Sequence, residues 1–399
     1  MSLHRFAFIV FLALAMTPLY LHAADKDKQP AAAAAAPDTL VLSNGDILHG
    51  KLVQEADGTV TFHSDPLGDI KVSWDKIKEL HATENFAVLS SLVKKRGKKA
   101  TEKLPSGSID VASGAVTVRT SNGQGTPAPI PVKDAAVIVD SAALDKQLNH
   151  EPNFFTGWNG AATAGATLVS ATQDQYAVSG SIGLVRVIPT VTWLDPRNRT
   201  SADFSGSFGK ITQPAFTSAG VFTPASVTKS AISHFDAERD EYVSSRFFAL
   251  GQTAFDHNYG QDLNLQQVYG GGLGWTALKT PKQEADLKAT AQYEKQDFIT
   301  GAASANQNLI GSTFSGSYIL KLKLVTFTQG VAYIPAWNNE RAYSAQETDT
   351  FAFPAYKRFS LSLGTLDSYL NDPPSTEPPT KRNSFQFTMG LTYAIKSKY

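Results

Sequence analysis

The stretch NSFQFTMGLTYAI, residues Asn383–Ile395, alternates between two kinds of side chain. Its apolar residues are Phe385, Phe387, Met389, Leu391, Tyr393 and Ile395, and each residue between them is polar or small. Successive side chains of a β-strand point to opposite faces, so this pattern predicts a strand with one apolar and one polar face.

The same period of two recurs along the chain from Gly157 onward. It is found in YAVSGSIGL (176–184), ADFSGSFGK (202–210), LNLQQVYGGGLGWTAL (263–278), ADLKATAQY (285–293) and FSGSYILKLKL (314–324). A soluble β-sandwich would turn the apolar faces inward, whereas a membrane barrel would turn them outward to lipid. Long strands with aromatic residues near their ends favour the barrel. We therefore expect an all-β fold in which residues 153–399 form an antiparallel up-and-down transmembrane β-barrel of about twelve strands.

The alternation also assigns the two faces of this barrel. The residues predicted to face lipid are Phe385, Phe387, Leu391, Tyr393, Leu273, Trp275, Phe314, Tyr318 and Leu287. The residues predicted to face the lumen are Asp203, Asp286, Lys288, Glu294, Lys321 and Lys323. These charged side chains could line a pore, or they could pair across the barrel and block it.

Inner connections are expected at Asp195–Thr200 and Thr280–Gln283, and three further short inner turns at Glu238–Asp240, Lys323–Val325 and Phe353–Ala355. The second of these three turns, in LKLKLVTFTQ, contains no turn residue and is indicated only by a change in the parity of the apolar residues. A bulge in one long strand would give the same change, so ten strands remain an alternative to twelve. Arg186 shares the parity of the apolar Ile182 and Leu184, which requires it to lie near an interface or beside a bulge.

The N-terminal segment indicates export. His4 and Arg5 precede an apolar run that ends near Pro18, and small residues follow at Ala23 and Ala24. This pattern is typical of a signal peptide at residues 1–23, with a retained N-terminal anchor as the alternative. Residues 24–37 are rich in Ala and Pro and are interpreted as a linker.

Residues 38–146 are predicted to form a small SH3-like β domain in the periplasm. Asn44-Gly45 and Asp57-Gly58 are typical hairpin turns. GTVTFHS at 58–64 recurs as GAVTVRT at 114–120, which suggests a two-fold internal repeat. The basic run Lys94–Lys103 is interpreted as a solvated loop, with a clamp for phosphate-rich ligands as the alternative. His49, His63 and His81 lack the spacing of metal ligands, so no metal site is predicted.

The chain end carries a pattern similar to the C-terminal signal that the outer-membrane insertion machinery recognises. Gly390, Tyr393 and Ile395 occupy its glycine, aromatic and apolar positions, although KSKY follows where such chains often stop on Phe. With DTLVLSNGDILHGKLV, GWNGAATAGATLVSA, RTSADFSGSFGK and VYGGGLGWTAL, residues 38–399 resemble the YdiY-like salt-induced outer membrane proteins, a family of unknown function. The resemblance implies an outer-membrane β-barrel and supplies no catalytic residues.

Composition excludes several classes of function. Lys plus Arg and Asp plus Glu both number 36, which gives no general case for nucleic-acid binding, and the absence of cysteine excludes disulfides and thiol chemistry. No catalytic or phosphate-binding motif is present, and YGGGLG at 269–274 lacks the pattern of a dinucleotide site, so it is interpreted as strand glycines beside a crowded lumen or a bulge. No cofactor is predicted.

The leading hypothesis is a narrow channel or an envelope structural and stress-response protein whose small domain contacts a periplasmic protein or the cell wall. The alternatives are a membrane-embedded lipid hydrolase using His234 with Asp236, or Asp256 with His257, and a secreted β-sandwich binding module.

Overall fold

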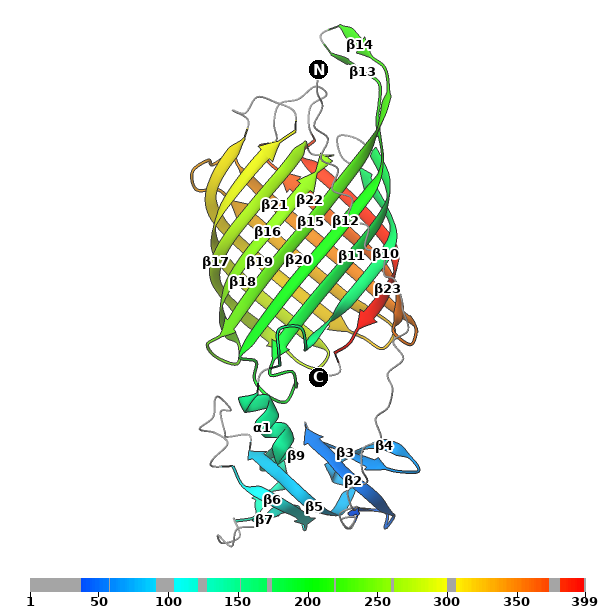
Figure 1. Cartoon of the computed structure of the whole chain (residues 1–399), viewed down its shortest axis with the longest axis vertical. Helices are drawn as coiled ribbons and strands as arrows, with labels where there is room; N and C mark the ends of the chain where they lie inside the picture. The colour runs from blue at the N-terminus through cyan, green and yellow to red at the C-terminus, as the bar shows by residue number, and fades with distance from the viewer. Residues whose placement is uncertain are drawn as a thin grey trace, which may run out of the picture.

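The computed structural model describes residues 37–56, 58–90, 104–120, 128–150, 152–170, 174–218, 220–259, 262–299, 306–372 and 381–397. These residues form a small β domain and a closed barrel, with the small domain below one end of the barrel (Figure 1). The predicted signal peptide, all but the last residue of the linker and the basic run Lys94–Lys103 lie outside the described residues. No helix in the described ranges is long and apolar enough to cross a membrane.

The small domain is a curved antiparallel sheet wrapped around one apolar core. Its strands are β1 (Asp38–Leu42), β2 (Ile47–Ala56), β3 (Thr59–Ser64), β4 (Gly68–Ser73), β5 (Ile77–Ser90), β6 (Ser106–Ala112), β7 (Ala115–Arg119), β8 (Ile130–Pro131) and β9 (Ala135–Asp140). β9 pairs with both β2 and β5, which gives the sheet a barrel-like form. Phe62, Phe86 and Ile109 are buried at its centre. Three strands, a 3₁₀ turn and a strand occur in this order twice, with the turns at Trp74–Lys76 and Val132–Asp134.

A helix that the sequence analysis did not predict follows β9. α1 (Ser141–Asn149) begins where the Asp140 side chain accepts a hydrogen bond from Ala143 N at 2.8 Å. The small domain therefore continues past residue 146, because α1 packs Leu144 and Leu148 against β5 and β9.

α1 also fastens the small domain to the barrel. Leu194, in the connection between β11 and β12, is buried in the same apolar cluster as Leu144 and Leu148. The Gln147 Oε1 atom accepts hydrogen bonds from Thr190 N and Oγ1, both at 3.1 Å. The contact is thus both apolar and hydrogen-bonded, and it holds the domain below the barrel end (Figure 1).

The barrel has twelve antiparallel strands. They are β10 (Trp158–Ser170), β11 (Asp174–Ile188), β12 (Asn198–Gln213), β15 (Ser226–Tyr242), β16 (Phe247–Asn258), β17 (Leu263–Lys279), β18 (Gln283–Phe298), β19 (Gln307–Lys321), β20 (Thr326–Pro335), β21 (Tyr343–Tyr356), β22 (Phe359–Leu370) and β23 (Asn383–Ile395). β23 closes the ring by pairing with β10, with Leu391 opposite Ala164. Closure leaves no free sheet edge in the barrel. The predicted all-β fold with a twelve-stranded barrel is confirmed.

The turns of the barrel correct two predictions and support a third. Residues 238–240 lie inside β15, and residues 353–355 lie inside β21, so neither forms a turn. The prediction failed at 238–240 because charged side chains that point into a lumen look like turn residues. It failed at 353–355 because Pro354 was taken to end a strand, whereas it sits beside a bulge between Pro354 and Tyr356. The turn near Lys323 is present: Leu322 N donates to Val325 O, which removes the ten-strand alternative.

One connection rises far above the others. Between β12 and β15 the chain forms a separate hairpin of β13 (Phe216–Ser218) and β14 (Val221–Thr223), at the end of the barrel opposite the small domain (Figure 1). Val221 and Phe222 are exposed near its tip.

Candidate functional site: the barrel wall and lumen

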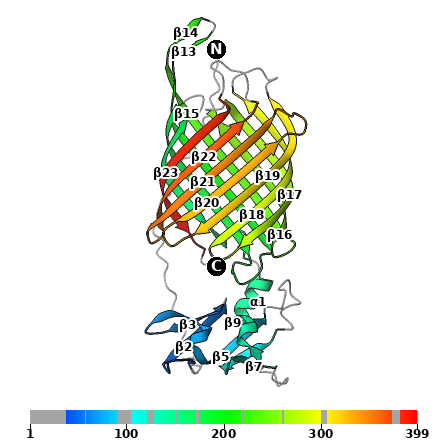
Figure 2. The same cartoon turned by 180° about the vertical axis from the view of Figure 1, so that it is seen from behind.

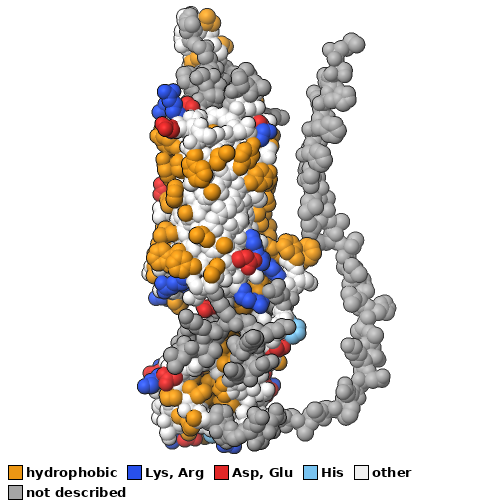
Figure 3. Space-filling view, turned by 90° about the vertical axis from the view of Figure 1, so that its left-hand side faces the viewer, with side chains coloured by type: hydrophobic (Ala, Val, Ile, Leu, Met, Phe, Trp, Pro, Cys, Tyr) orange, Lys and Arg blue, Asp and Glu red, His pale blue; other side chains and the backbone are white. Residues whose placement is uncertain are grey.

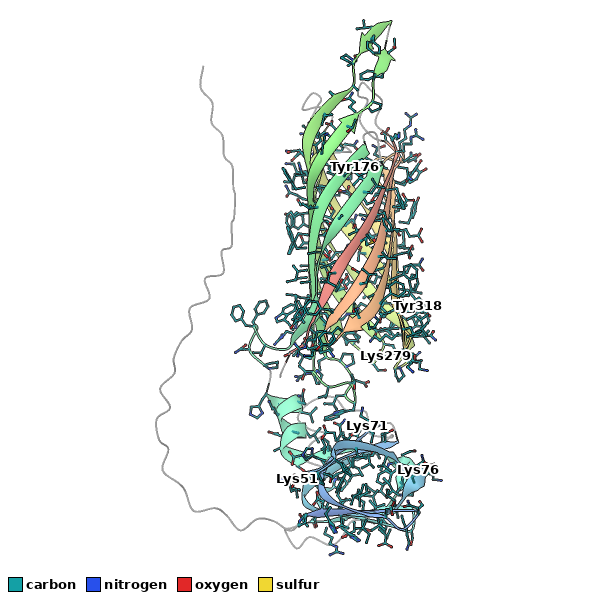
Figure 4. The ribbon with its side chains drawn as sticks, turned by 90° about the vertical axis from the view of Figure 1, so that its right-hand side faces the viewer. Lys51, Lys71, Lys76, Tyr176, Lys279 and Tyr318 are labelled. Atoms are coloured by element: carbon teal, nitrogen blue, oxygen red, sulfur yellow. The ribbon has the colours of Figure 1, made fainter. Side chains whose placement is uncertain are left out.

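The outer wall of the barrel is mostly apolar. Figure 3 shows hydrophobic side chains along the barrel wall, with Lys, Arg, Asp and Glu side chains mainly toward its ends. In Figure 4, Tyr176 and Tyr318 lie toward opposite ends of the barrel, Tyr318 nearer the small domain. Aromatic residues at two levels of an apolar wall are typical of barrels that cross a membrane.

The residues predicted to face lipid point away from the lumen. The exposed members of this set are Phe385, Phe387, Leu391, Tyr393, Leu273, Trp275, Phe314 and Leu287. Tyr318 is half-buried, and its hydroxyl donates to Gln283 Oε1 at 3.0 Å. Among the described residues, these apolar side chains therefore lie on the outer wall and do not pack together into a core inside the barrel.

A polar interruption crosses this wall on β20, β21 and β22, the strands nearest the viewer in Figure 2. Glu347 lies opposite Asp367 and shares its outward parity with Asp349 and Phe351. Glu347 accepts a hydrogen bond from Gln329 Nε2 at 3.0 Å. The Oδ1 atoms of Asp349 and Asp367 are buried and have no hydrogen-bond partner among the described residues. Carboxylates on a lipid-facing wall reduce stability.

Replacing Asp349 with leucine is expected to raise the free energy of unfolding of the vesicle-embedded barrel by about 1 kcal/mol. The change removes a polar side chain from the apolar wall without touching the lumen. Urea titration followed by tryptophan fluorescence measures the effect, and Asp349→Asn, which keeps the side chain polar, should give a smaller gain. A loss of stability in Asp349→Leu would contradict a lipid-facing position.

The lumen has two different walls. β10, β11 and β20–β23 contribute hydroxyl and amide side chains such as Thr163, Ser181 and Thr348, whereas β12, β15, β16 and β18 carry the charged groups. A cavity of about 690 Å³ lies between the two walls, and a second of about 370 Å³ lies against the hydroxyl wall. Thr348 borders both. Polar side chains therefore line much of the described lumen, interspersed with apolar ones such as Ile334 and Leu366, and the charged groups lie on one side.

Arg199 organises the charged wall near the small domain. From β12 its Nε atom donates to Asp240 Oδ2 at 2.7 Å, and its Nη2 atom lies 2.8 Å from Asp286 Oδ2 on β18. Its Nη1 atom lies 3.3 Å from Glu284 Oε1. Asp240 and Asp286 are almost fully buried, and the guanidinium lies 5.3 Å from the Phe248 ring centroid. Asp240 lies on the neighbouring strand β15, whereas Asp286 and Glu284 lie on β18, which does not pair with β12, so the Arg199 side chain reaches across part of the lumen.

The Phe248 ring requires a residue without a side chain at one position of YGGGLG, Gly274. A Cβ atom at Gly274 would lie 2.2 Å from the Phe248 ring, so only glycine leaves room for that ring on the inner wall. The expectation that this glycine run lies beside a crowded lumen is therefore correct at Gly274.

The other predicted lumen residues differ in their surroundings. Lys288 Nζ donates to Glu238 Oε1 at 2.5 Å, and Glu294 accepts hydrogen bonds from Gln266 and Gln296. Asp203 borders the larger cavity beside Gly183, where it makes no ion pair among the described residues. Lys321 ends β19 and is exposed. Lys323 lies in the turn after β19, so its prediction as a lumen-facing residue of a strand is wrong.

His234 does not form the base of a hydrolase. Its Nδ1 atom lies 2.5 Å from Asp256 Oδ1, and its Nε2 atom lies 3.0 Å from Asp236 Oδ1. Both ring nitrogens thus face carboxylates, and neither is free to accept a proton from a serine. His257 instead donates to the carbonyl oxygen of Asn264 at 2.6 Å.

In the small domain, His63 and His81 each lie beside a different carboxylate and do not form a common site. His63 lies 2.7 Å from Asp69, and His81 lies 2.6 Å from Asp110. Within the described ranges no group of three or more His, Cys, Asp or Glu side chains has the arrangement of a metal site.

The residues of the C-terminal signal pattern lie at the barrel seam. Gly390 is opposite Gly165, and a Cβ atom at Gly390 would lie 2.6 Å from Ala164 O. Tyr393 packs against Phe359 with ring centroids 5.1 Å apart, and Ile395 ends β23. Glycine at position 390 therefore has a packing reason that is independent of the predicted signal.

Arg186 shows how an outward-facing arginine is accommodated. Its guanidinium donates to the carbonyl oxygens of Thr156 and Pro152, at 2.9 and 2.7 Å, and the side chain is buried. The segment that leads into β10 thus covers Arg186 at the end of the barrel near the small domain. A position at the end of the barrel is compatible with the first of the two expectations for Arg186, a place near an interface.

Fold and lumen together define a closed twelve-stranded antiparallel β-barrel with a mostly apolar outer wall, a polar interior and a small β domain at one end. The chain belongs to the DUF481 family, described as protein of unknown function, whose sequence profile matches residues 162–395. The comparison with curated proteins found no match.

Several solved barrels resemble this one at low identity. The NanC porin is 8% identical with a TM-score of 0.36, and the match covers 59% of this chain and 100% of that one. The COG4313 outer membrane channel from Pseudomonas putida F1 is 13% identical with a TM-score of 0.37, covering 61% and 99%. The KdgM porin in complex with disordered oligogalacturonate is 8% identical with a TM-score of 0.32, covering 59% and 99%.

Proposed function

We propose that the protein is a narrow, cation-preferring channel of the bacterial outer membrane, with its small domain in the periplasm. The observation that carries the proposal is a closed barrel whose side chains are mostly apolar outside and polar inside. A closed barrel satisfies its backbone hydrogen bonds within the membrane, and a polar interior can hold water and ions.

The two ends of the barrel support this orientation. Near the small domain the connections are mostly short, as at residues 243–246, 280–282 and 357–358. At the other end they include 299–306, 371–382 and the β13–β14 hairpin. Bacterial barrels have short periplasmic turns and longer external loops, and the same asymmetry here supports a small domain on the periplasmic side.

The preference for cations follows from the charges of the inner wall. The carboxylates that point inward on the middle strands outnumber the inward cations Arg199 and Lys288, even with His234 protonated. They are Asp203, Asp236, Glu238, Asp240, Asp256, Asp286 and Glu294. Near the ends, Glu284, Lys279 and Lys321 add one acidic and two basic groups. The lumen is thus net negative, and a low-dielectric wall strengthens its attraction for cations.

Conductance across a planar bilayer tests the proposal. In a potassium chloride gradient the refolded full chain is expected to pass current with a reversal potential of the sign that marks cation preference. Asp203→Lys should shift that potential toward zero or past it, because Asp203 borders the larger cavity. Glu347→Gln removes an acidic residue from the outer wall and should leave the potential unchanged. Anion preference in the unmodified chain, or equal shifts in the two variants, would contradict the proposal.

A structural role in the envelope is the second candidate, and the Arg199 contacts favour it. Side chains that join β12 to β18 narrow the lumen near the small domain. This role agrees with the resemblance to YdiY-like salt-induced proteins. Residues 38–146 would then contact a periplasmic protein or the cell wall, and Lys51, Lys71 and Lys76 are exposed at separate positions on the small domain (Figure 4). A folded barrel that passes no current would support this candidate over the channel.

Assembly in either case would use the bacterial barrel insertion machinery, with Gly390, Tyr393 and Ile395 as its recognition pattern.

A further inference from the structure

Asp203 is an inward carboxylate without a cationic partner among the described residues. Its side chain is exposed and borders the lumen cavity of about 690 Å³. Asp236 lies directly opposite it on β15, where the Nε2 atom of His234 lies 3.0 Å from Asp236 Oδ1. Two carboxylates that stand opposite each other on neighbouring strands repel, and a bound cation relieves that repulsion. The charge of Asp203 is therefore open to a ligand in the cavity.

Gly183 allows the Asp203 side chain to lean over β11. Residue 183 lies opposite Asp203, and a Cβ atom there would lie 2.3 Å from Asp203 Oδ1. The next inward residues are Ser181 on β11 and Ser205 on β12, which lie opposite each other and border both cavities of the lumen. One carboxylate and two hydroxyl groups therefore stand together on this part of the wall.

The rest of the larger cavity has both aliphatic and polar side chains. Ile232 of β15, Ile334 of β20 and Leu366 of β22 border it, together with Thr348 and Thr350 of β21. Its volume lies within the range of about 300–1,000 Å³ that is typical of sites for small organic molecules. Aliphatic surface stabilises a ligand with carbon–hydrogen faces, and the hydroxyl groups stabilise one with several hydrogen-bonding groups. An organic cation with hydroxyl groups therefore uses this wall more fully than an inorganic cation does.

We propose that the larger cavity binds an amino sugar, which carries an ammonium group on a hydroxylated ring. The ammonium group pairs with Asp203, the ring hydroxyls exchange hydrogen bonds with Ser181 and Ser205, and the carbon face of the ring packs on the aliphatic side chains. The inference rests on the proposed cation-preferring channel, since it names a substrate class for the same lumen. A polyamine has the charge without the hydroxyls, and a neutral sugar has the hydroxyls without the charge, so each uses only part of the site.

Isothermal titration calorimetry of the refolded full chain in detergent tests the proposal, with glucosamine as the probe at a mildly acidic pH. N-acetylglucosamine keeps the hydroxyls but has no charge, and ethylamine keeps the charge but has no hydroxyls. Glucosamine should bind about tenfold more tightly than either compound. Asp203→Asn should weaken glucosamine binding about tenfold and leave N-acetylglucosamine binding unchanged. Ser205→Ala should weaken the binding of both sugars about threefold and leave ethylamine binding unchanged.

Glu347→Gln is the matched control. It removes one carboxylate from the outer wall, as Asp203→Asn removes one from the lumen, and it should leave glucosamine binding unchanged. A shift in gel mobility between unboiled and boiled samples verifies that each variant is folded. Equal affinity for glucosamine and ethylamine, or an equal effect of Asp203→Asn and Glu347→Gln, would overturn the amino-sugar site.

Calorimetry requires no current, so the two proposals can fail separately. A chain that binds glucosamine as expected but does not conduct would contradict the channel and support the site. A cation-preferring chain that binds glucosamine no more tightly than N-acetylglucosamine would contradict the site and leave the channel intact.

Discussion

Replacing Arg199 with methionine is expected to lower the free energy of unfolding of the barrel by about 3–5 kcal/mol. Methionine keeps much of the length of the side chain but removes the positive charge between Asp240 and Asp286. Both carboxylates are buried, since only 1% of the surface of Asp240 and 3% of the surface of Asp286 is accessible to solvent. Removing one partner of a buried ion pair leaves charge without compensation, which costs more than the pair itself contributes.

Urea titration in detergent, followed by gel mobility and tryptophan fluorescence, measures this loss. Arg239→Met is the matched control, because Arg239 lies on the outward face of β15 and pairs with Glu241 at 2.7 Å on an exposed surface. An exposed pair contributes at most about 1 kcal/mol. Adding Asp240→Asn and Asp286→Asn to Arg199→Met should restore part of the stability. If Arg199→Met and Arg239→Met cost the same, the three residues do not form a buried network.

The barrel could be predicted from sequence because each strand repeats the same local pattern. Period-two alternation fixes which residues share a face, and strand length favours a barrel over a small sandwich. The alternation even located the turn at Leu322–Val325, where no Gly, Pro, Asn or Asp is present. The predicted turn at Glu238–Asp240 was wrong, because acidic side chains that face the lumen from within a strand resemble the polar residues of a turn.

The Arg199 network could not be predicted, because it depends on closure of the ring. Arg199 and Asp286 are far apart in sequence and lie on strands that do not pair. Only the curvature of the complete barrel brings them to 2.8 Å. The available signal was the parity of Arg199, which equals that of Asp203 and places it inside. Lys323 shows the opposite error: parity was applied beyond the end of β19, where the chain turns and alternation no longer has meaning.

Replacing Met389 with arginine tests which side of the wall faces hydrocarbon. Met389 is half-exposed on the outer face and stands midway between Phe385 and Tyr393 on β23. An arginine on the lipid face costs about 2–4 kcal/mol at the bilayer midplane and about 0–1 kcal/mol near the interfaces. Met389→Arg is therefore expected to lower the free energy of unfolding in vesicles by about 2–4 kcal/mol, and Leu391→Arg, nearer one interface, by less.

The inward control for this series is Thr348→Arg rather than the adjacent Thr392. Thr392 exchanges hydrogen bonds of 2.8 Å with Thr163 and Ser362, so its replacement would disturb the seam. Thr348 borders the lumen cavities, where an arginine has room and solvent, and its replacement should change stability little. The decisive quantity is how the loss of stability depends on depth in the bilayer. If the face meets lipid, arginine should cost more at Met389 than at Leu391, whereas in a protein core the two costs would not follow depth. Equal costs at Met389 and Thr348 would show that the apolar face does not meet lipid, and the proposed membrane location would fail with it.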